Sequence, residues 1–308
     1  MLGELRPWVR EVSPDGAAMG RPARRFAFRG DAGYVLGADV GAHKVLVMLA
    51  DLRGEVVASR RVEVDAGMSA SRRLGVLERA ALECAGGVGR SRVLAVGVGT
   101  AGIVDPSGRV SLSSVLPGWT GVDLAGLAGR WFGCQGLAAN DANLAALAEH
   151  WRGSAQHVDD MVYVLVGRRI RAGLLLGGVL RAGRGGAAGE VGALPQLGWE
   201  AAARELDPKV FLAAAEGDGR ALRVVEGIAA NLAVGTAALV LGVDPQLVVF
   251  GGGYAGAGEV LLGPLREHLG ALCLSPLEVA LSTFGDESVA LGGVRLALDH
   301  VERHVLDL

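Results

Sequence analysis

Two adjacent polar side chains in the segment AANDAN have the chemistry to bind and deprotonate a hydroxyl group. Asn140 and Asp141 follow a predicted strand over residues 135–139 and open a predicted helix, so they lie at a strand-to-helix junction. There Asp141 can accept the proton of a ligand hydroxyl while Asn140 hydrogen-bonds a neighbouring hydroxyl. The alternative is a helix N-cap, which contributes about 1 kcal/mol. The two roles are compatible, because a cap occupies only one polar atom.

A second carboxylate, Glu190, lies within the run GRGGAAGEVG at residues 183–192. A lone carboxylate among small residues is unusual for a packed core. The small neighbours leave room for a ligand, and the two carboxylate oxygens can accept hydrogen bonds from adjacent hydroxyls. The pattern favours a polyol-binding glutamate over a structural one.

The run GADVGAHK at residues 37–44 combines a carboxylate, a glycine turn and a cation. Gly41 lets backbone N–H groups approach phosphate oxygens, Asp39 can hold Mg²⁺ through water, and Lys44 supplies positive charge. An ordinary hairpin turn would give the same pattern in a chain with 49 glycines. The presence here of one of only two lysines favours a phosphate site.

Another predicted strand end, GVGTAGIVD at residues 97–105, carries small residues around Gly102. Small side chains there let a ligand lie against the backbone, but they also suit close packing of a strand on a helix. The residues alone leave both interpretations open.

The elements that must position these residues repeat one plan. Hydrophobic alternation predicts three meandering strands over residues 35–64, and a strand pair over 161–179 opens a second unit in the same way. We therefore expect an α/β protein with two similar lobes and a cleft between them. The expected parts are an irregular basic arm over residues 1–32, an N-terminal lobe over 33–139 and a C-terminal lobe over 140–308, whose last helix, about 289–303, can pack back on the first lobe.

Composition limits the class of protein that this chain can be. Hydrophobic residues make up 51% and charged residues 20% of its 308 residues, which excludes a disordered chain. A net charge of −3 argues against nucleic acid as the main partner. The three cysteines form no CxxC pair and the N-terminus has no apolar signal core, so we expect a cytoplasmic protein. The uncharged run over residues 227–243 is expected to be a buried helix rather than a membrane span.

Together these four motifs, in this order, resemble the ROK family of bacterial sugar kinases and sugar-responsive repressors, which have the actin-like (ribonuclease H-like) fold. The likeness extends from Gly20 to the C-terminus and is most specific at NDANLAALAEHWRGSA and GRGGAAGEVGAL. It implies that Asp141 is the catalytic base in a kinase member. The resemblance also implies a sugar-binding set of Asn140, Asp141, Glu190 and Gly102, and a nucleotide- and phosphate-binding set, with Mg²⁺, of Asp39, Gly41, Lys44, Gly167, Gly252 and Gly253.

Two departures from the family pattern bear on activity. Kinase members carry a second phosphate loop of the type GTGIGxG, where this chain reads GRRIRAG at residues 167–173. Long side chains obstruct the backbone cradle that in-line phosphoryl transfer requires, although guanidinium groups do bind phosphate. Ala193 stands where the zinc- and sugar-contacting histidine of the family is expected, and no cysteine cluster follows. We therefore expect no zinc site.

The segment GRPAR at residues 20–24 resembles the join between the winged-helix domain and the core of repressor members. Only 19 residues precede it, which is too short for a DNA-reading winged helix. Either the start codon is misassigned or this lineage has lost the domain.

These observations favour a sugar-binding, regulator-type core with weak or no kinase activity, homodimeric by family resemblance. The alternative is an ATP-dependent hexose or aminosugar kinase that uses Asp141 as general base, with ATP and Mg²⁺ as cofactors. A DNA-binding repressor ranks last. The expected partner is a small-molecule sugar, with neither nucleic acid nor a membrane.

Overall fold

A five-stranded sheet forms the centre of the first lobe in the computed structural model, which describes residues 7–12, 25–254 and 257–306. Its strands are β3 (Tyr34–Val40), β4 (Lys44–Asp51), β5 (Val56–Glu63), β6 (Val93–Thr100) and β9 (Gln135–Asn140), in the order β5-β4-β3-β6-β9. The first three form an antiparallel meander, and β6 and β9 extend the sheet in parallel. The predicted meander over residues 35–64 is confirmed.

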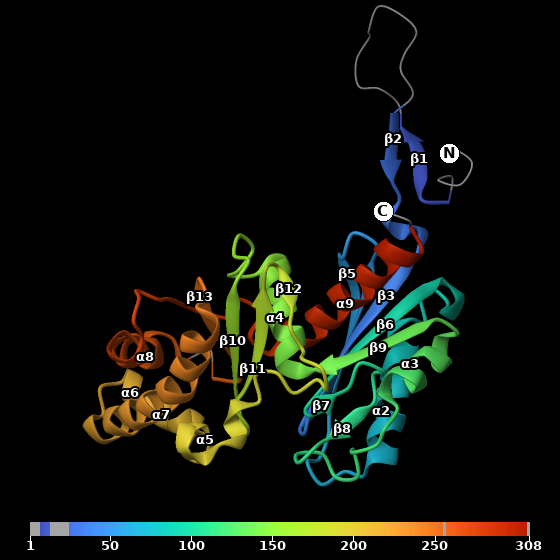
Figure 1. Cartoon of the computed structure of the whole chain (residues 1–308). Coiled ribbons are helices and arrows are strands. Elements are labelled where there is room, and N and C mark those ends of the chain that lie inside the picture. Colours follow the sequence, from blue (N-terminus) through green and yellow to red (C-terminus); the bar gives the residue numbers. More distant parts are fainter. Residues whose placement is uncertain (1–6, 13–24, 255–256, 307–308) are drawn as a thin grey trace, which may run out of the picture.

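The second lobe repeats this topology. Its strands are β10 (Met161–Val166), β11 (Arg171–Leu176), β12 (Val179–Leu180), β13 (Leu247–Gly252) and β14 (Glu278–Leu281), in the order β12-β11-β10-β13-β14. Again an antiparallel meander is followed by two parallel strands. Figure 1 shows one such sheet in each lobe, so the predicted α/β fold of two similar lobes is confirmed.

Helices cover both faces of each sheet, which explains why the central strands are apolar on both sides. The covering helices are α2 (Ala70–Cys84), α3 (Leu124–Phe132), α4 (Asp141–Arg152), α7 (Gly219–Val243), α8 (Glu259–Leu272) and α9 (Ser288–His304). Helices α2 and α3 pack on one face of the first sheet and α9 on the other. Helices α7 and α8 pack on one face of the second sheet and α4 on the other. The last helix therefore lies against the sheet of the first lobe.

The shorter elements connect these layers. They are β7 (Ile103–Val104) and β8 (Val110–Leu112) in the first lobe, and α5 (Trp199–Glu205) and α6 (Pro208–Ala215) beside α7 in the second. Two short 3₁₀ helices, η3 (Val191–Ala193) and η6 (Gly285–Glu287), lie next to residues of the predicted site.

Within the described residues, α7 is the one helix long and apolar enough to cross a membrane. It packs against α5, α6 and α8, and 56% of its most apolar stretch is buried inside the protein. Its buried residues belong to the core of the second lobe. This is the environment expected of a core helix.

Helices α4 and α9 cross between the two sheets, and glycines allow them to approach closely (Figure 1). A Cβ at Gly292 would lie 1.8 Å from the carbonyl oxygen of Leu144, and one at Gly97 would lie 2.1 Å from that of Gly293. For Gly97, the close-packing interpretation of the GVGTAGIVD segment therefore holds. This crossing fixes α4, and with it the strand-to-helix junction that carries Asn140 and Asp141.

Replacing Gly292 by alanine should destabilise the protein by about 2–3 kcal/mol, because the added methyl group overpacks the contact between α4 and α9. A matched control is Gly270→Ala in α8, where a Cβ meets open space among the described residues. That change should stabilise the helix by up to about 1 kcal/mol. Urea unfolding of both variants checks the difference, and equal midpoints would contradict the close crossing.

The N-terminal segment is not an irregular arm where the structure describes it. Strands β1 (Val9–Val12) and β2 (Arg25–Phe28) form a separate antiparallel pair, with Val9 opposite Phe28. Trp8 and Phe28 pack against the first-lobe core beside α9, which supplies the burial that holds the pair in place. The predicted join GRPAR, residues 20–24, lies outside the described residues.

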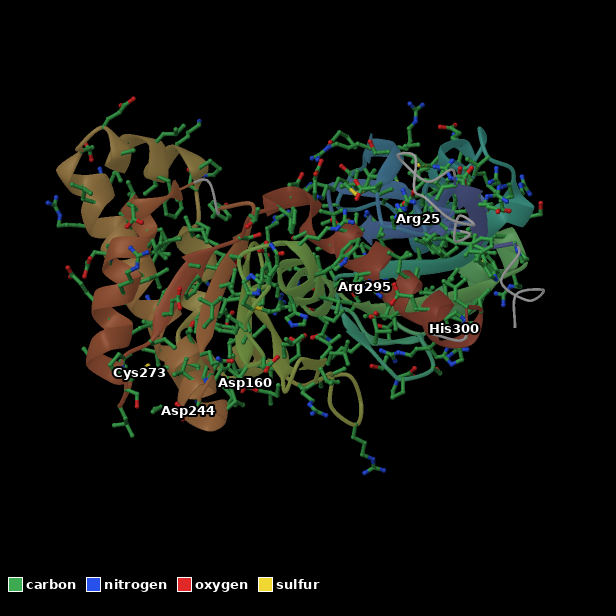
Figure 2. All side chains as sticks on the ribbon, turned by 90° about the horizontal axis from the view of Figure 1, so that it is seen from above. Arg25, Asp160, Asp244, Cys273, Arg295 and His300 are labelled. Carbon is green, nitrogen blue, oxygen red and sulfur yellow. The ribbon has the colours of Figure 1, made fainter. Side chains whose placement is uncertain are left out.

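The three cysteines are free. Figure 2 shows Cys273 in the second lobe, whereas Arg25 of β2 lies over the first lobe. The described chain is therefore held together by packing rather than by disulfide bonds.

Candidate functional site

The side chain of Asn140 combines the two roles that the sequence left compatible. Its amide oxygen accepts a hydrogen bond from the backbone N–H of Ala142 at 2.8 Å, which caps α4. Its amide nitrogen donates to the carbonyl oxygen of Gly102 at 2.9 Å and to Oε1 of Glu190 at 3.3 Å. The buried amide of Asn140 thus connects Asn140 to Gly102 and Glu190, two other residues of the predicted sugar-binding set, and also caps the N-terminus of α4.

Asp141 lies beside Asn140 at the start of α4 and is 8% exposed. Its Oδ2 accepts a hydrogen bond from Nη1 of Arg171 at 3.0 Å, and its Oδ1 accepts one from the N–H of Ala142. Burial raises the pKa of Asp141, while Arg171 and the backbone hydrogen bond oppose that rise. The predicted base therefore has a guanidinium group on one of its two carboxylate oxygens.

Glu190 reaches Asn140 from a loop whose glycines are required by close contacts. Gly186 and Gly189 have φ of 79° and 85°, and a Cβ at either would lie within 2.3 Å of the carbonyl oxygen of Val104 or Ala172 respectively. These contacts hold the loop against both lobes and fix the backbone just before Glu190. Burial raises the pKa of Glu190, and the nearby Arg171 opposes that effect.

A cavity of about 370 Å³ lies between the lobes. That volume is within the range of pockets that hold small molecules. From the first lobe it is lined by Gly102, Ile103, Leu112 and Ser114, and from the second by Arg168–Arg171, Glu190, Gly192, Ala193, Trp199, Glu200, Ala203 and Arg204. The predicted sugar residues Gly102 and Glu190 both face this larger cavity. Ala193 also lines it, at the position where the family resemblance implies histidine.

A second cavity, of about 190 Å³, collects every residue predicted to bind phosphate or nucleotide. Its lining includes Asp39, Gly41, Lys44, Gly167, Gly252 and Gly253, together with Asp141. A Cβ at Gly253 would meet open space within the described residues, so packing does not require glycine there. Gly252 differs, because its φ is 95° and a Cβ there would lie 2.4 Å from the carbonyl oxygen of Val166, and both facts demand glycine.

The carboxylates of this smaller cavity are all paired with cations. Lys44 contacts Asp39 at 3.2 Å and also binds Asp286 of η6, which pairs with Arg61 as well. Burial raises the pKa of Asp39 to about 6 against the opposing effect of Lys44. Asp141 is likewise held by Arg171, so a divalent cation would have to displace Lys44 or Arg171, or bind Oδ1 of Asp39, which has no ion pair among the described residues. The Mg²⁺ site implied by the resemblance therefore stays a prediction.

The turn between β10 and β11 brings arginine side chains into both cavities. Arg168, Arg169 and Arg171 line the larger and the smaller cavity alike. Nη1 of Arg168 lies 2.9 Å from Nε2 of His43, which is in the corresponding turn of the first lobe. The two opening hairpins of the duplicated fold thus meet across the cleft.

Several residues of the site could not be found from the sequence. Trp199, Glu200 and Arg204 come from α5, a short helix with no motif around it, and Asp286 comes from η6, just before α9. The pairing of Arg171 with Asp141 also depends on tertiary structure, because 30 residues separate them. The only local signal for Asp286 was an acidic pair, Asp286 and Glu287, before a helix.

Known proteins share this architecture. The sequence profile of the ROK family matches residues 35–197 and 195–300. A xylose repressor from Caldicellulosiruptor bescii is 24% identical over 87% of this chain and 79% of its own length. A glucokinase from Halalkalibacterium halodurans is 24% identical over 66% of this chain and 76% of its own length.

A solved structure agrees in fold. The ROK family glucokinase from Streptomyces griseus, crystallised with glucose and AMPPNP, superposes with a TM-score of 0.74 at 23% identity. The match covers 87% of this chain and all of that one. At this identity the likeness concerns the fold, whereas ligand and activity have to be argued from the side chains above.

Proposed function

Because the chain belongs to the ROK family, we propose that it is a sugar-binding protein of the regulator type, with weak or no kinase activity. Its relatives include both a repressor and a glucokinase, so family membership alone is compatible with either activity. The choice between them rests on the side chains of the cleft.

The observation that carries the proposal is the ion pair between Arg171 and Asp141. A general base needs a carboxylate lone pair within reach of the proton that it removes, and a guanidinium group bound to that carboxylate weakens it as a base by stabilising its charged form. Here Oδ2 of Asp141 accepts from Arg171 and Oδ1 accepts from a backbone N–H, in a site that is nine-tenths buried. The same arginine turn lines the smaller cavity, where a triphosphate would have to align for in-line transfer.

The proposed sugar site remains available in the larger cavity. Oxygens of Glu190 can accept hydrogen bonds from adjacent sugar hydroxyls, and Asn140 can shift its amide between Gly102 and a hydroxyl. Trp199 is buried beneath this cavity, where its indole N–H donates to the carbonyl oxygen of Leu232, and it supports the cavity from below. Binding and orientation of a monosaccharide therefore need none of the groups that the arginines obstruct.

A kinase is the second candidate, and one observation favours it. All residues of the predicted phosphate set line a single cavity that Asp141 also reaches. In that case Arg171 would have to leave Asp141 for a phosphate oxygen of ATP, which would free the carboxylate to accept the proton of a sugar hydroxyl. Arginine binds phosphate well enough for such an exchange.

Other proposed properties do not depend on the cleft. We propose action in a reducing cytoplasm from the cysteine pattern, no zinc because Ala193 replaces the family histidine, and a homodimeric state from the family resemblance. We do not expect nucleic acid or membrane binding by the described part of the chain.

A coupled assay with a panel of hexoses and aminosugars, ATP and Mg²⁺ tests the proposal. We expect turnover below about 0.01 s⁻¹, against roughly 1–100 s⁻¹ for kinases. At least one sugar should nevertheless raise the melting temperature of the same protein. Clear turnover that Asp141→Asn abolishes would show an active kinase and overturn the proposal.

A further inference from the structure

The larger cavity carries more positive charge than a neutral sugar needs. Four arginines line it, Arg168, Arg169, Arg171 and Arg204, against two glutamates, Glu190 and Glu200. Hydroxyl groups can accept hydrogen bonds from guanidinium groups, but they offer no negative charge to offset the water that these groups lose. The charge of this cavity therefore points to a group on the ligand that the proposed neutral sugar lacks.

Two of these arginines are already paired with carboxylates of the protein. Arg204 donates to Glu200 at 2.6 Å, and Arg171 donates to Asp141 at 3.0 Å. Among the described residues, Arg168 hydrogen-bonds the imidazole of His43 and no carboxylate. Arg169 has no hydrogen bond or ion pair there, although its charge lowers the pKa of the nearby Glu190. Two guanidinium groups thus remain without a carboxylate in direct contact.

Arg168 and Arg169, the two arginines without a paired carboxylate, lie where the two cavities meet. Arg168 and Arg169 line both the larger cavity, with Glu190, and the smaller one, with Lys44 and Gly167. Glu190, the proposed sugar contact, lines the larger cavity together with both arginines. Two arginines and the backbone turn around them present N–H donors that match the oxygens of a phosphate group.

We propose that the ligand of this site is a monosaccharide phosphate, with its sugar at Asn140 and Glu190 and its phosphate at Arg168 and Arg169. The inference rests on the proposed sugar-binding function and specifies the ligand of that same site. It also explains the arginine turn as a binding feature: the side chains that obstruct a triphosphate are placed to receive one phosphate already attached to the sugar.

Isothermal titration of the full chain with matched pairs tests this assignment. The probes are glucose, mannose, N-acetylglucosamine and N-acetylmannosamine, each with its 6-phosphate, together with glucuronate and inorganic phosphate. At least one sugar phosphate should bind about tenfold or more tightly than its parent sugar, since both arginines are partly solvated. This ratio should fall as salt is raised, because salt screens exposed charges.

The variant Arg169→Ala should reduce the ratio between phosphate and parent sugar to about twofold or less. The control Arg79→Ala removes an exposed arginine of α2, remote from both cavities, and should leave the ratio unchanged. Circular dichroism confirms that both variants are folded.

Three results would overturn the assignment. Parent sugars could bind as tightly as their phosphates, glucuronate could bind more tightly than any phosphate, or inorganic phosphate alone could account for the binding. The first two leave the proposed sugar-binding function intact. If neither a sugar nor a sugar phosphate binds, the proposed function fails together with the inference.

Discussion

Replacing Arg171 by alanine should destabilise the protein by about 3–5 kcal/mol. The change leaves the Asp141 carboxylate buried with no cationic partner, while its surroundings still disfavour the charged form. Because burial already raises the pKa of Asp141, loss of Arg171 should raise it further. The carboxylate would then be protonated in the folded state at mildly acidic pH.

The higher pKa of Asp141 in Arg171→Ala determines how the stability of this variant depends on pH. A group whose pKa is higher in the folded state stabilises the fold below its unfolded pKa, and this contribution is lost as the pH rises through the folded value. The deficit of Arg171→Ala relative to wild type should therefore be small near pH 4 and largest at neutral pH. Urea unfolding at a series of pH values measures it.

A double variant separates the ion pair from simple loss of packing. Arg171→Met with Asp141→Asn replaces both charges by neutral groups of similar size, so most of the lost stability should return. If the double variant is as unstable as the sum of the two single variants, the two side chains are not coupled and the pairing is wrong.

Glu190→Gln should weaken binding of the cognate sugar about a hundredfold. Glutamine keeps the shape of the side chain, but replaces a carboxylate that can accept two charge-assisted hydrogen bonds with an amide that can accept at one end only. Two such bonds account for an effect of this size, at roughly tenfold for each. Calorimetric titration with the tightest-binding sugar measures the loss.

The matched control is Glu200→Gln in the same cavity. Glu200 is exposed and already paired with Arg204, so a ligand at Glu190 does not depend on it. Its replacement should change the affinity by less than about threefold, since exposed ion pairs contribute little. Similar losses in both variants would mean that Glu190 has no special role.

The sequence predicted the repeated part of the fold well. The strands over residues 35–64 and the helix that begins at Asp141 follow from hydrophobic periodicity and a strong N-cap, which are local signals. The gathering of Asn140, Glu190 and Gly102 also agrees with their motifs, because each motif occurs where a strand or loop ends at the cleft.

Elements stabilised by distant contacts were missed. Helix α8 contains Gly263 and Pro264, which locally argue against a helix. Its leucines at helical spacing pack on α7, and this burial outweighs the local preference. The pair β1 and β2 was missed because its two strands are too far apart in sequence to form a recognisable hairpin.

The partners of the arginines in the site also could not be predicted from the sequence. The GRRIR segment indicates crowding of a phosphate loop, but not that Arg171 would face Asp141 while Arg168 reaches His43. Register decides this: Arg171 opens β11, which packs beside α4, so its side chain meets the first turn of that helix. A shift of one residue would direct it to the other face of the sheet.

Calorimetric titration of AMPPNP with Mg²⁺, in the presence and absence of the tightest-binding sugar or sugar phosphate, tests whether the cleft binds a sugar ligand but no nucleotide. We predict saturable one-to-one binding of the sugar ligand and no measurable binding of the nucleotide at millimolar concentration, with or without that ligand. Saturable nucleotide binding at micromolar concentration, strengthened by the sugar, would contradict it and establish a kinase site.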